Sequence, residues 1–268
     1  MNEAATTQAP HPTEPRRSWR FAQPLSTGHS LYWWAEVSCV LAYYLVYSAI
    51  RNTTNANPTA ALRHAKQVIS FEKTLRIYHE QTLHEGARSI RALIIACNYF
   101  YGSLHFVVTI GVGVFLFRKM PDAYSRWRNT LAIATGLALI GFWTYQLMPP
   151  RLLPASYGYV DTLAQYPTFW SFNSGAISKL SNQFAAMPSV HCCWALWCAC
   201  ALTPRLRRPW AKALAIAYPI TTVIVIVLTA NHYFIDAIGG FAILLFGYLI
   251  AHRVTRAGLV PIDSKPVS

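Results

Sequence analysis

The sequence contains Met187-Pro188-Ser189-Val190-His191 and, further on, Asn231-His232-Tyr233-Phe234-Ile235-Asp236. Each stretch lies where a polar segment gives way to a long apolar run, so each marks the start of a helix that could enter a membrane. The distribution of charge along the chain predicts that both starts lie on the same side of that membrane. We therefore expect two histidines and a carboxylate to gather at a bilayer surface.

The composition favours a membrane protein. Only 12% of the 268 residues are charged and 54% are hydrophobic, whereas about a quarter of the residues in a soluble domain are charged. Apolar stretches of about 20 residues match the roughly 30 Å of a hydrocarbon core. We predict an all-α integral membrane protein, a single bundle of six transmembrane helices near 31–50, 92–117, 129–148, 189–204, 210–230 and 233–252.

The positive charge of the chain predicts its topology. A formal charge of +13 can indicate nucleic acid binding, but here the cations gather in short segments on one side of the predicted spans. Such a bias marks the cytoplasmic face, so we expect a plasma membrane protein with both termini inside and no nucleic acid partner. The segments hold Arg16, Arg17, Arg20, Arg118, Lys119, Arg126, Arg128, Arg205, Arg207, Arg208, Lys212, Arg253, Arg256 and Lys265.

The ends of the chain are expected to be tails. Residues 1–28 are polar and rich in proline, which predicts a disordered cytoplasmic tail without a cleavable signal peptide. The membrane domain is expected over 29–256, followed by a second cytoplasmic tail over 257–268. All six cysteines fall inside predicted spans, where they are read as small buried hydrophobic residues. We therefore expect no metal and no cofactor, and the sequence carries no signal of an oligomeric state.

The first outer segment, residues 51–90, predicts an amphipathic helix. Apolar residues recur at helical spacing and cations lie between them, which is typical of a helix lying in the membrane interface. Anchoring is the simpler interpretation of this helix, and direct contact with a substrate is the alternative. The apolar positions are Leu62, Ala65, Val68, Ile69 and Leu75, and the cations are Arg63, Lys66, Lys73 and Arg76.

The second outer segment, residues 149–188, predicts a folded loop. It is rich in proline and in aromatic residues, and disordered segments are poor in aromatics. Loops of this length are usually functional, so a lid or a wall of a lipid pocket is expected. The aromatic residues are Tyr157, Tyr159, Tyr166, Phe169, Trp170 and Phe172.

His232 and Asp236 are expected to act as a pair. They are four residues apart and share one face of a helix. The carboxylate can hold one imidazole nitrogen and leave the other free as a nucleophile or base. An ionisable residue below the membrane surface is costly and usually functional. The alternative is a hydrogen-bonded pair that only joins two helices.

The first stretch predicts a phosphate-binding helix start. Ser189 is a typical N-cap, and the N–H groups of a helix N-terminus attract phosphate. His191 lies in the first turn and would face whatever binds there. The alternative for His191 is an interfacial histidine that contacts only water.

Arg151 is the third candidate. It follows Pro149-Pro150 at the outer end of the third span and could hold phosphate oxygens in a bidentate manner, or could only extend to lipid head groups. His105 and Asn231 are weaker candidates. Asn98 and Glu36 are explained by hydrogen bonding inside the bundle.

These residues resemble the type 2 phosphatidic acid phosphatase superfamily of membrane lipid phosphatases and phosphotransferases. Its motifs are K-x6-R-P, P-S-G-H and S-R-x5-H-x3-D. Pro188-Ser189-Val190-His191 resembles the second motif, and the spacing of His232 and Asp236 resembles the end of the third. Arg151 matches the arginine of the first. The departures are Thr144 in place of its lysine, Leu152 in place of its proline, and Val225-Ile226 in place of Ser-Arg.

The departures resemble the branch that contains inositol phosphorylceramide synthases, here as a bacterial member. That resemblance implies a mechanism without metal in which His232 forms a phosphohistidine and Asp236 orients its ring. It implies that His191 protonates the leaving oxygen, and that Arg151 and the helix start at Ser189 bind the phosphoryl oxygens. The implied substrate is a lipid phosphate or phospholipid at the outer leaflet. Water as acceptor would make the protein a phosphatase, and a sugar, inositol or lipid hydroxyl would make it a transferase.

Two other classes stay open from the sequence. One is a transporter whose histidines relay protons, with Glu36 and His105 as hints of a deeper path. Proton paths usually cross the middle of the bilayer, whereas these ionisable residues cluster at one surface. The other is an inactive scaffold of the same fold, which the missing lysine and Ser-Arg would permit.

Overall fold

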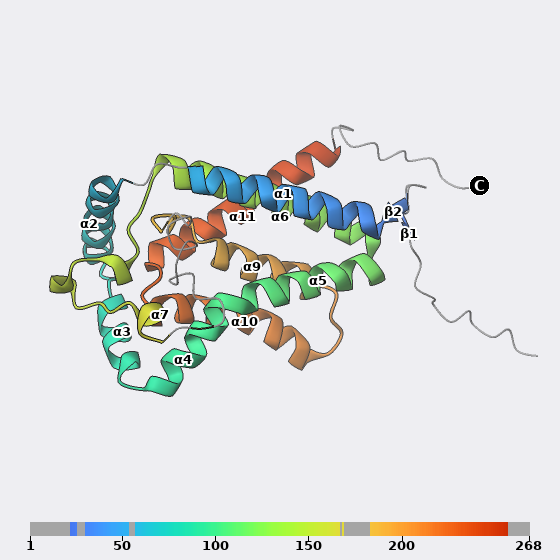
Figure 1. The fold of residues 1–268 in the computed structure, drawn as a ribbon. Coiled ribbons are helices and arrows are strands. Elements are labelled where there is room, and N and C mark those ends of the chain that lie inside the picture. Colours follow the sequence, from blue (N-terminus) through green and yellow to red (C-terminus); the bar gives the residue numbers. More distant parts are fainter. Residues whose placement is uncertain (1–21, 26–29, 54–56, 167, 169–182, 257–268) are drawn as a thin grey trace, which may run out of the picture.

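The structure is a computed structural model that describes residues 22–25, 30–53, 57–166, 168 and 183–256. Long helices lie side by side along one axis, and shorter helices cover one end of them (Figure 1). The elements are β1 (Ala22–Pro24), β2 (Ser30–Tyr32), α1 (Trp33–Thr53), α2 (Pro58–Thr74), α3 (Glu80–Arg88), α4 (Arg91–Tyr99), η1 (Phe100–Leu104), α5 (His105–Lys119), α6 (Pro121–Thr144), η2 (Pro150–Leu152), η3 (Ala155–Tyr157), α7 (Thr162–Gln165), α9 (Val190–Leu202), α10 (Pro209–Leu228) and α11 (Phe234–Arg256).

Four helices in the described part of the chain are long and apolar enough to cross a membrane: Trp33–Arg51, Arg91–Lys119, Pro209–Leu228 and Phe234–Val254. The protein is therefore a helical membrane protein. Helix α9 is a shorter apolar helix, and α6 packs along α11 inside the same bundle. The number of spans stays the prediction of six, with α6 and α9 as the other two.

Glycines allow the helices that carry the two motifs to pack closely. A Cβ on Gly240 of α11 would lie 2.3 Å from the backbone oxygen of Ser189, at the start of α9. A Cβ on Gly141 of α6 would lie 2.4 Å from Cδ of Pro188. Small residues let helix backbones approach in this way in membrane bundles. The start of α9 is thus wedged between α6 and α11.

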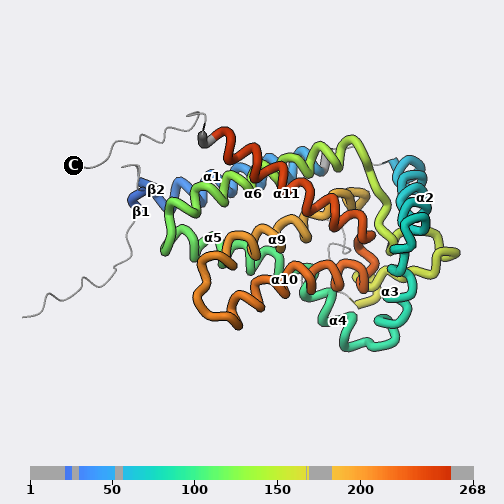
Figure 2. The backbone as a smooth tube through the Cα atoms, turned by 180° about the vertical axis from the view of Figure 1, so that it is seen from behind, coloured from blue at the N-terminus to red at the C-terminus, as the bar shows by residue number. Residues whose placement is uncertain are grey.

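The outer layer begins with α2, which lies across the ends of the long helices (Figures 1 and 2). Its predicted apolar face is largely correct, since Ala65, Val68 and Ile69 are buried. Leu75 is an error of that prediction: it is 51% exposed because α2 ends at Thr74 and Leu75 is its C-cap. Glu72 takes the next buried position on this face and is fully buried.

The outer loop is folded onto the bundle where it is described. Its residues form η2, η3 and α7, and Leu147 bridges to Ala185 near its far end. His84 of α3 holds the middle: Nδ1 donates to the backbone oxygen of Leu228 (2.8 Å), and Nε2 accepts from the N–H of Val160 (3.2 Å). Burial lowers the pKa of His84, which favours this neutral form.

Some expectations fall outside the described residues. Phe169, Trp170 and Phe172 of the loop do so, as does the predicted tail at 257–268. The predicted tail at 1–28 does so too, except for residues 22–25, where β1 pairs antiparallel with β2.

The end of the bundle opposite to α2 carries the predicted basic segments that are described (Figure 1). There Arg128 of α6 forms an ion pair with Glu36 of α1, and the hydroxyl of Tyr124 donates to the same carboxylate (3.0 Å). Glu36 therefore joins α1 and α6 by polar contacts inside the bundle, as the sequence predicted.

Candidate active site

Three imidazole rings meet where α9, α11 and the α4–α5 helix converge. The ring centroids of His191 and His232 are 5.7 Å apart, and those of His191 and His105 are 4.3 Å apart. Tyr101 stacks on His191 at 4.2 Å. The two motifs, which are far apart in the sequence, thus meet at the end of the bundle that α2 and α3 cover.

His232 lies in the tight turn between α10 and α11. The turn passes through Ala230, a non-glycine residue in the left-handed region (φ 53°). The N–H groups of Asn231 and His232 both donate to the backbone oxygen of Ile226 (2.9 and 3.3 Å). Such strained residues persist where the surroundings fix them, and they are common at functional sites. The backbone therefore fixes the position of the His232 side chain.

Asp236 contacts His232 across one turn. Its Oδ2 lies 3.3 Å from Nδ1 of His232 and also accepts the N–H of Tyr233 (3.0 Å). Asp236 is fully buried and His232 is 4% exposed. Among the described residues, Nε2 of His232 has no hydrogen-bond partner. The arrangement orients the imidazole and leaves its second nitrogen available.

Ser189 is the N-cap of α9, as the sequence indicated. Its hydroxyl accepts from the N–H of Cys192 (3.4 Å), and its own N–H donates to the backbone oxygen of Asp236 (2.9 Å). The first intrahelical bond runs from Cys193 to Ser189. The N–H groups of Val190 and His191 precede that bond, and these groups, rather than the Ser189 side chain, suit an anion at the helix start.

Arg151 is tied to the second motif. Its backbone N–H donates to Ala230 (2.8 Å), its Nε donates to Oδ1 of Asn231 (2.9 Å), and its Nη1 forms an ion pair with Asp161 (2.7 Å). Asn231, a weaker candidate from the sequence, is thus a partner of the arginine. Asp161 was missed, although an aspartate before Thr162 is a typical N-cap, and it caps α7 by accepting from Leu163 and Ala164.

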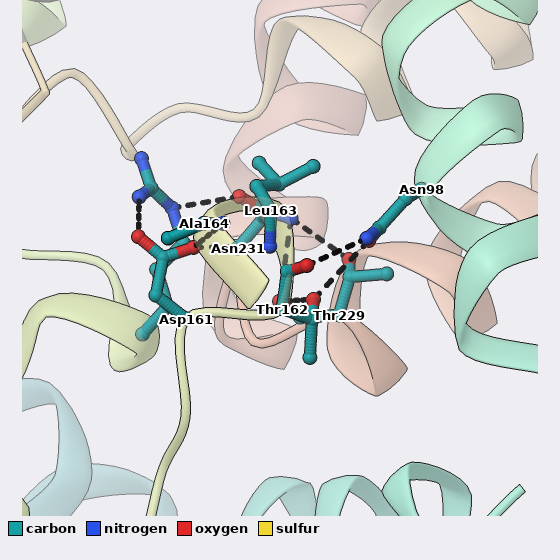
Figure 3. Close-up of polar contacts among 8 residues, drawn as sticks. Asn98, Asp161, Thr162, Leu163, Ala164, Thr229 and Asn231 are labelled. Carbon is teal, nitrogen blue, oxygen red and sulfur yellow. Dashed lines mark hydrogen bonds and ion pairs between the residues drawn. The ribbon is translucent and has the colours of Figure 1, made fainter. Parts of the chain in front are cut away.

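A buried polar network fixes α7 and therefore Asp161. Asn98 of α4 donates to the backbone oxygen of Thr162 (2.8 Å) and accepts from its hydroxyl (3.1 Å). The Asn231 amide donates to the hydroxyl of Thr229 (2.8 Å). Figure 3 shows this network linking α4, α7 and the turn before α11. Asn98 is a structural residue, as the sequence indicated, and it supports Arg151 indirectly by fixing α7 and Asp161.

His105 reaches the site through an irregular helix. The π-helical turn η1 lies directly before His105, and such turns are frequent at functional sites. Nδ1 of His105 donates to the backbone oxygen of Tyr101 (3.0 Å), because a carbonyl can only accept. A narrow gap beside His191 and His105 is lined further by Phe100, Tyr101, Tyr218, Thr222, Val225 and Ile226.

Arg51 is a second cation that sequence reasoning missed. It lies in the last turn of α1 and interacts electrostatically with His191 and with Tyr101. Its position could have indicated a role, because Arg51 ends a predicted span on the outer side, where the charge bias predicts few cations.

At the positions where this chain departs from the cationic parts of the family motifs, the side chains are unsuited to binding phosphate. Thr144 is exposed and its hydroxyl donates to Ile140 on its own helix (2.7 Å). Val225 and Ile226 are buried apolar residues of α10. Among the described residues, no three His, Cys, Asp or Glu side chains are grouped to hold a metal ion.

Comparison with known proteins agrees with this geometry at the level of a family. A family model of the PAP2 superfamily matches residues 66–250, a range that includes both motifs, Arg151 and Asp161. The chain belongs to the PAP2 superfamily. Membership supports a phosphatase or phosphotransferase of lipid phosphates. No curated protein and no solved structure matches the chain.

Proposed function

We propose that this protein is a lipid phosphotransferase or phosphatase that acts at the outer leaflet through a phosphohistidine on His232. The observation that carries the proposal is the state of that side chain: Nδ1 lies beside Asp236, and the buried Nε2 has no partner among the described residues. With a proton on Nδ1 directed at Asp236, the imidazole has its lone pair on Nε2, where it can act as a nucleophile.

The reaction has two balanced steps. Nε2 of His232 attacks phosphorus, the bond from phosphorus to the leaving oxygen breaks, and His191 gives that oxygen a proton. An acceptor hydroxyl then attacks phosphorus, gives its proton to His191, and the nitrogen–phosphorus bond breaks. The ring centroids of the two histidines are 5.7 Å apart, which supports a mechanism in which both act on the same phosphoryl group.

Charge on the phosphoryl oxygens needs donors in fixed positions. Arg151 is held by Asp161 and Asn231, and the N–H groups of the first turn of α9 precede the first intrahelical hydrogen bond. Arg51 supplies a second positive charge near His191. These groups take the place of the lysine and the arginine that the family motifs contain and this chain lacks.

Transfer to an alcohol is favoured over transfer to water, as in the inositol phosphorylceramide synthase-like branch. His232 is 4% exposed and Asp236 is fully buried, and a closed site protects a reactive intermediate from hydrolysis. The basic segments at the opposite end of the bundle support the outer location. Water as the acceptor is the second candidate.

The test uses the full chain in vesicles with a labelled lipid phosphate or phosphodiester, with and without inositol, a sugar or a lipid alcohol. Labelled product that depends on the alcohol supports a transferase, and free phosphate alone supports a phosphatase. His232→Ala should abolish both, whereas His79→Ala, an exposed histidine before α3, should change neither. Equal turnover in the His232→Ala variant would remove the mechanism.

A further inference from the structure

Two buried glutamates hold the first turn of α11. The N–H of Ile235 donates to Oε1 of Glu72 on α2 (2.8 Å), and the N–H of Phe234 donates to Oε1 of Glu80 on α3 (3.0 Å). The first N–H groups of a helix have no intrahelical acceptor, and the helix dipole is positive there. The outer layer therefore holds the helix that carries Asp236 by its N-terminus.

Neither glutamate has another visible role in the described part of the chain. Both are fully buried, and the Oε2 atom of each has no hydrogen-bond partner among the described residues. The ion pairs found there involve Glu36, Asp161 and Asp236 instead. Buried carboxyl groups without a cation are costly when ionised, so this pair calls for an explanation.

A proton between the two carboxyl groups satisfies both. The side chains of Glu72 and Glu80 interact with each other, so one O–H between them would give each Oε2 a partner. Two adjacent carboxylates cannot both ionise without strong repulsion. One proton leaves one negative charge, which suits the positive end of the α11 dipole.

The surroundings of the pair favour that proton. The titratable groups that face it are Asp236 and Tyr233 at the start of α11, Tyr78 between α2 and α3, and Tyr159 of the outer loop. The nearby Lys73 is exposed and lies over the ring of Tyr78 (5.2 Å). Burial, the neighbouring carboxyl group of Glu80 and the charge of Asp236 raise the pKa of Glu72 to about 9.

We propose that Glu72 and Glu80 are positioning residues that share one proton, hold α11 by its first N–H groups and so keep Asp236 against His232. This inference rests on the proposed function, in which Asp236 orients the nucleophile. The carboxyl pair acts through the helix and does not touch the substrate.

The pair gives the protein a defined response to pH. Below about pH 9 the pair keeps its proton, and above it two adjacent carboxylates repel and loosen the first turn of α11. The raised pKa of Glu72 also makes the free energy of unfolding depend on pH. Between pH 4.5 and about 9 the folded protein binds one proton more than the unfolded chain. The free energy of unfolding therefore falls as the pH rises through this window.

Three variants of the full chain separate positioning from simple packing. Glu72→Ala removes the acceptor for Ile235, and we expect kcat to fall by up to about 10²-fold with KM nearly unchanged, because small misplacements have such effects. Glu72→Gln keeps an acceptor and offers an N–H to Glu80 in place of the proton, so kcat should return to within about threefold of the wild type. Glu85→Ala removes an exposed glutamate of α3 and is the control.

The pH profile is the readout that packing alone would not move. Wild-type kcat should fall above about pH 9, and Glu72→Gln should remove that fall. Two further measurements do not depend on turnover. Infrared spectra should show a protonated carboxyl band that Glu72→Gln removes, and hydrogen exchange in residues 233–238 should be faster in Glu72→Ala.

The outcomes distinguish this inference from the proposed function. If the wild type turns over no lipid phosphate, the proposed function fails, and the infrared and exchange results still decide whether the pair holds α11. If Glu72→Gln leaves the carboxyl band unchanged and Glu72→Ala exchanges as slowly as the wild type, the inference is overturned. Loss of activity in Glu72→Ala that Glu72→Gln does not rescue also overturns it.

Discussion

Gly240→Ala tests the close packing that brings the two motifs together. The new Cβ would lie 2.3 Å from the backbone oxygen of Ser189, whereas ordinary contacts begin at 3.4 Å. The start of α9 would have to move by about 1 Å, and backbone cannot yield as a flexible side chain does. Misplacement by this amount can lower a rate by about 10²-fold, and overpacking of a core usually costs about 1–3 kcal/mol.

We therefore expect Gly240→Ala to lower kcat by about 10²-fold and to lower the thermal stability of the protein in detergent. The assay is turnover of a labelled lipid phosphate in vesicles, together with thermal unfolding. Gly111→Ala is the matched control, because Gly111 is exposed on α5 and a Cβ there meets nothing within 4 Å. It should keep full activity and gain up to about 1 kcal/mol from helix propensity. Wild-type turnover and stability in Gly240→Ala would refute the packing argument.

Three other changes probe the site. Arg151→Lys should lower kcat/KM for a lipid phosphate by about 10²-fold, because a lysine cannot replace the fixed guanidinium. Wild-type activity in Arg151→Lys would exclude a phosphate contact. Asp161→Asn should lower kcat/KM less, because Asn231 still holds Nε of Arg151. Arg51→Ala should raise KM for a lipid phosphate more at low salt than at high salt, because salt screens the charge of Arg51 in the wild type, and equal changes at both would contradict its electrostatic role. Burial lowers the pKa of His84 from 6.5, so the free energy of unfolding should fall as the pH drops below about 6.5, and chemical unfolding of His84→Gln should show a weaker dependence on pH.

Much of the bundle could be predicted because the hydrocarbon core imposes a length on apolar runs. Helix α10 begins at Pro209 and α11 at Phe234, each one residue from the predicted start of a span. The α2 face at Ala65, Val68 and Ile69 followed from helical spacing. Its error at Leu75 arose because a pattern does not say where a helix ends.

The site was predicted in part because its histidines stand in short motifs at helix starts. His191 and His232 meet as expected, since both helices begin at the same end of the bundle. Arg51 and Asp161 were missed because neither belongs to a motif: Arg51 interacts with His191 far along the chain, and Asp161 pairs with Arg151 inside a loop whose folding the sequence does not give. The buried position of Glu72 could not be predicted, because a carboxylate on an apolar face is read as a break in the pattern unless its buried partners are known.

The most direct test of the account is to trap the covalent intermediate. The full chain is mixed briefly with a lipid phosphate labelled at phosphorus, quenched with alkali to preserve phosphohistidine, and mapped by peptide mass. The account predicts label on His232, its absence in His232→Ala, and its accumulation when the acceptor alcohol is withheld. Turnover that proceeds without any labelled histidine, or label on another residue, would contradict it.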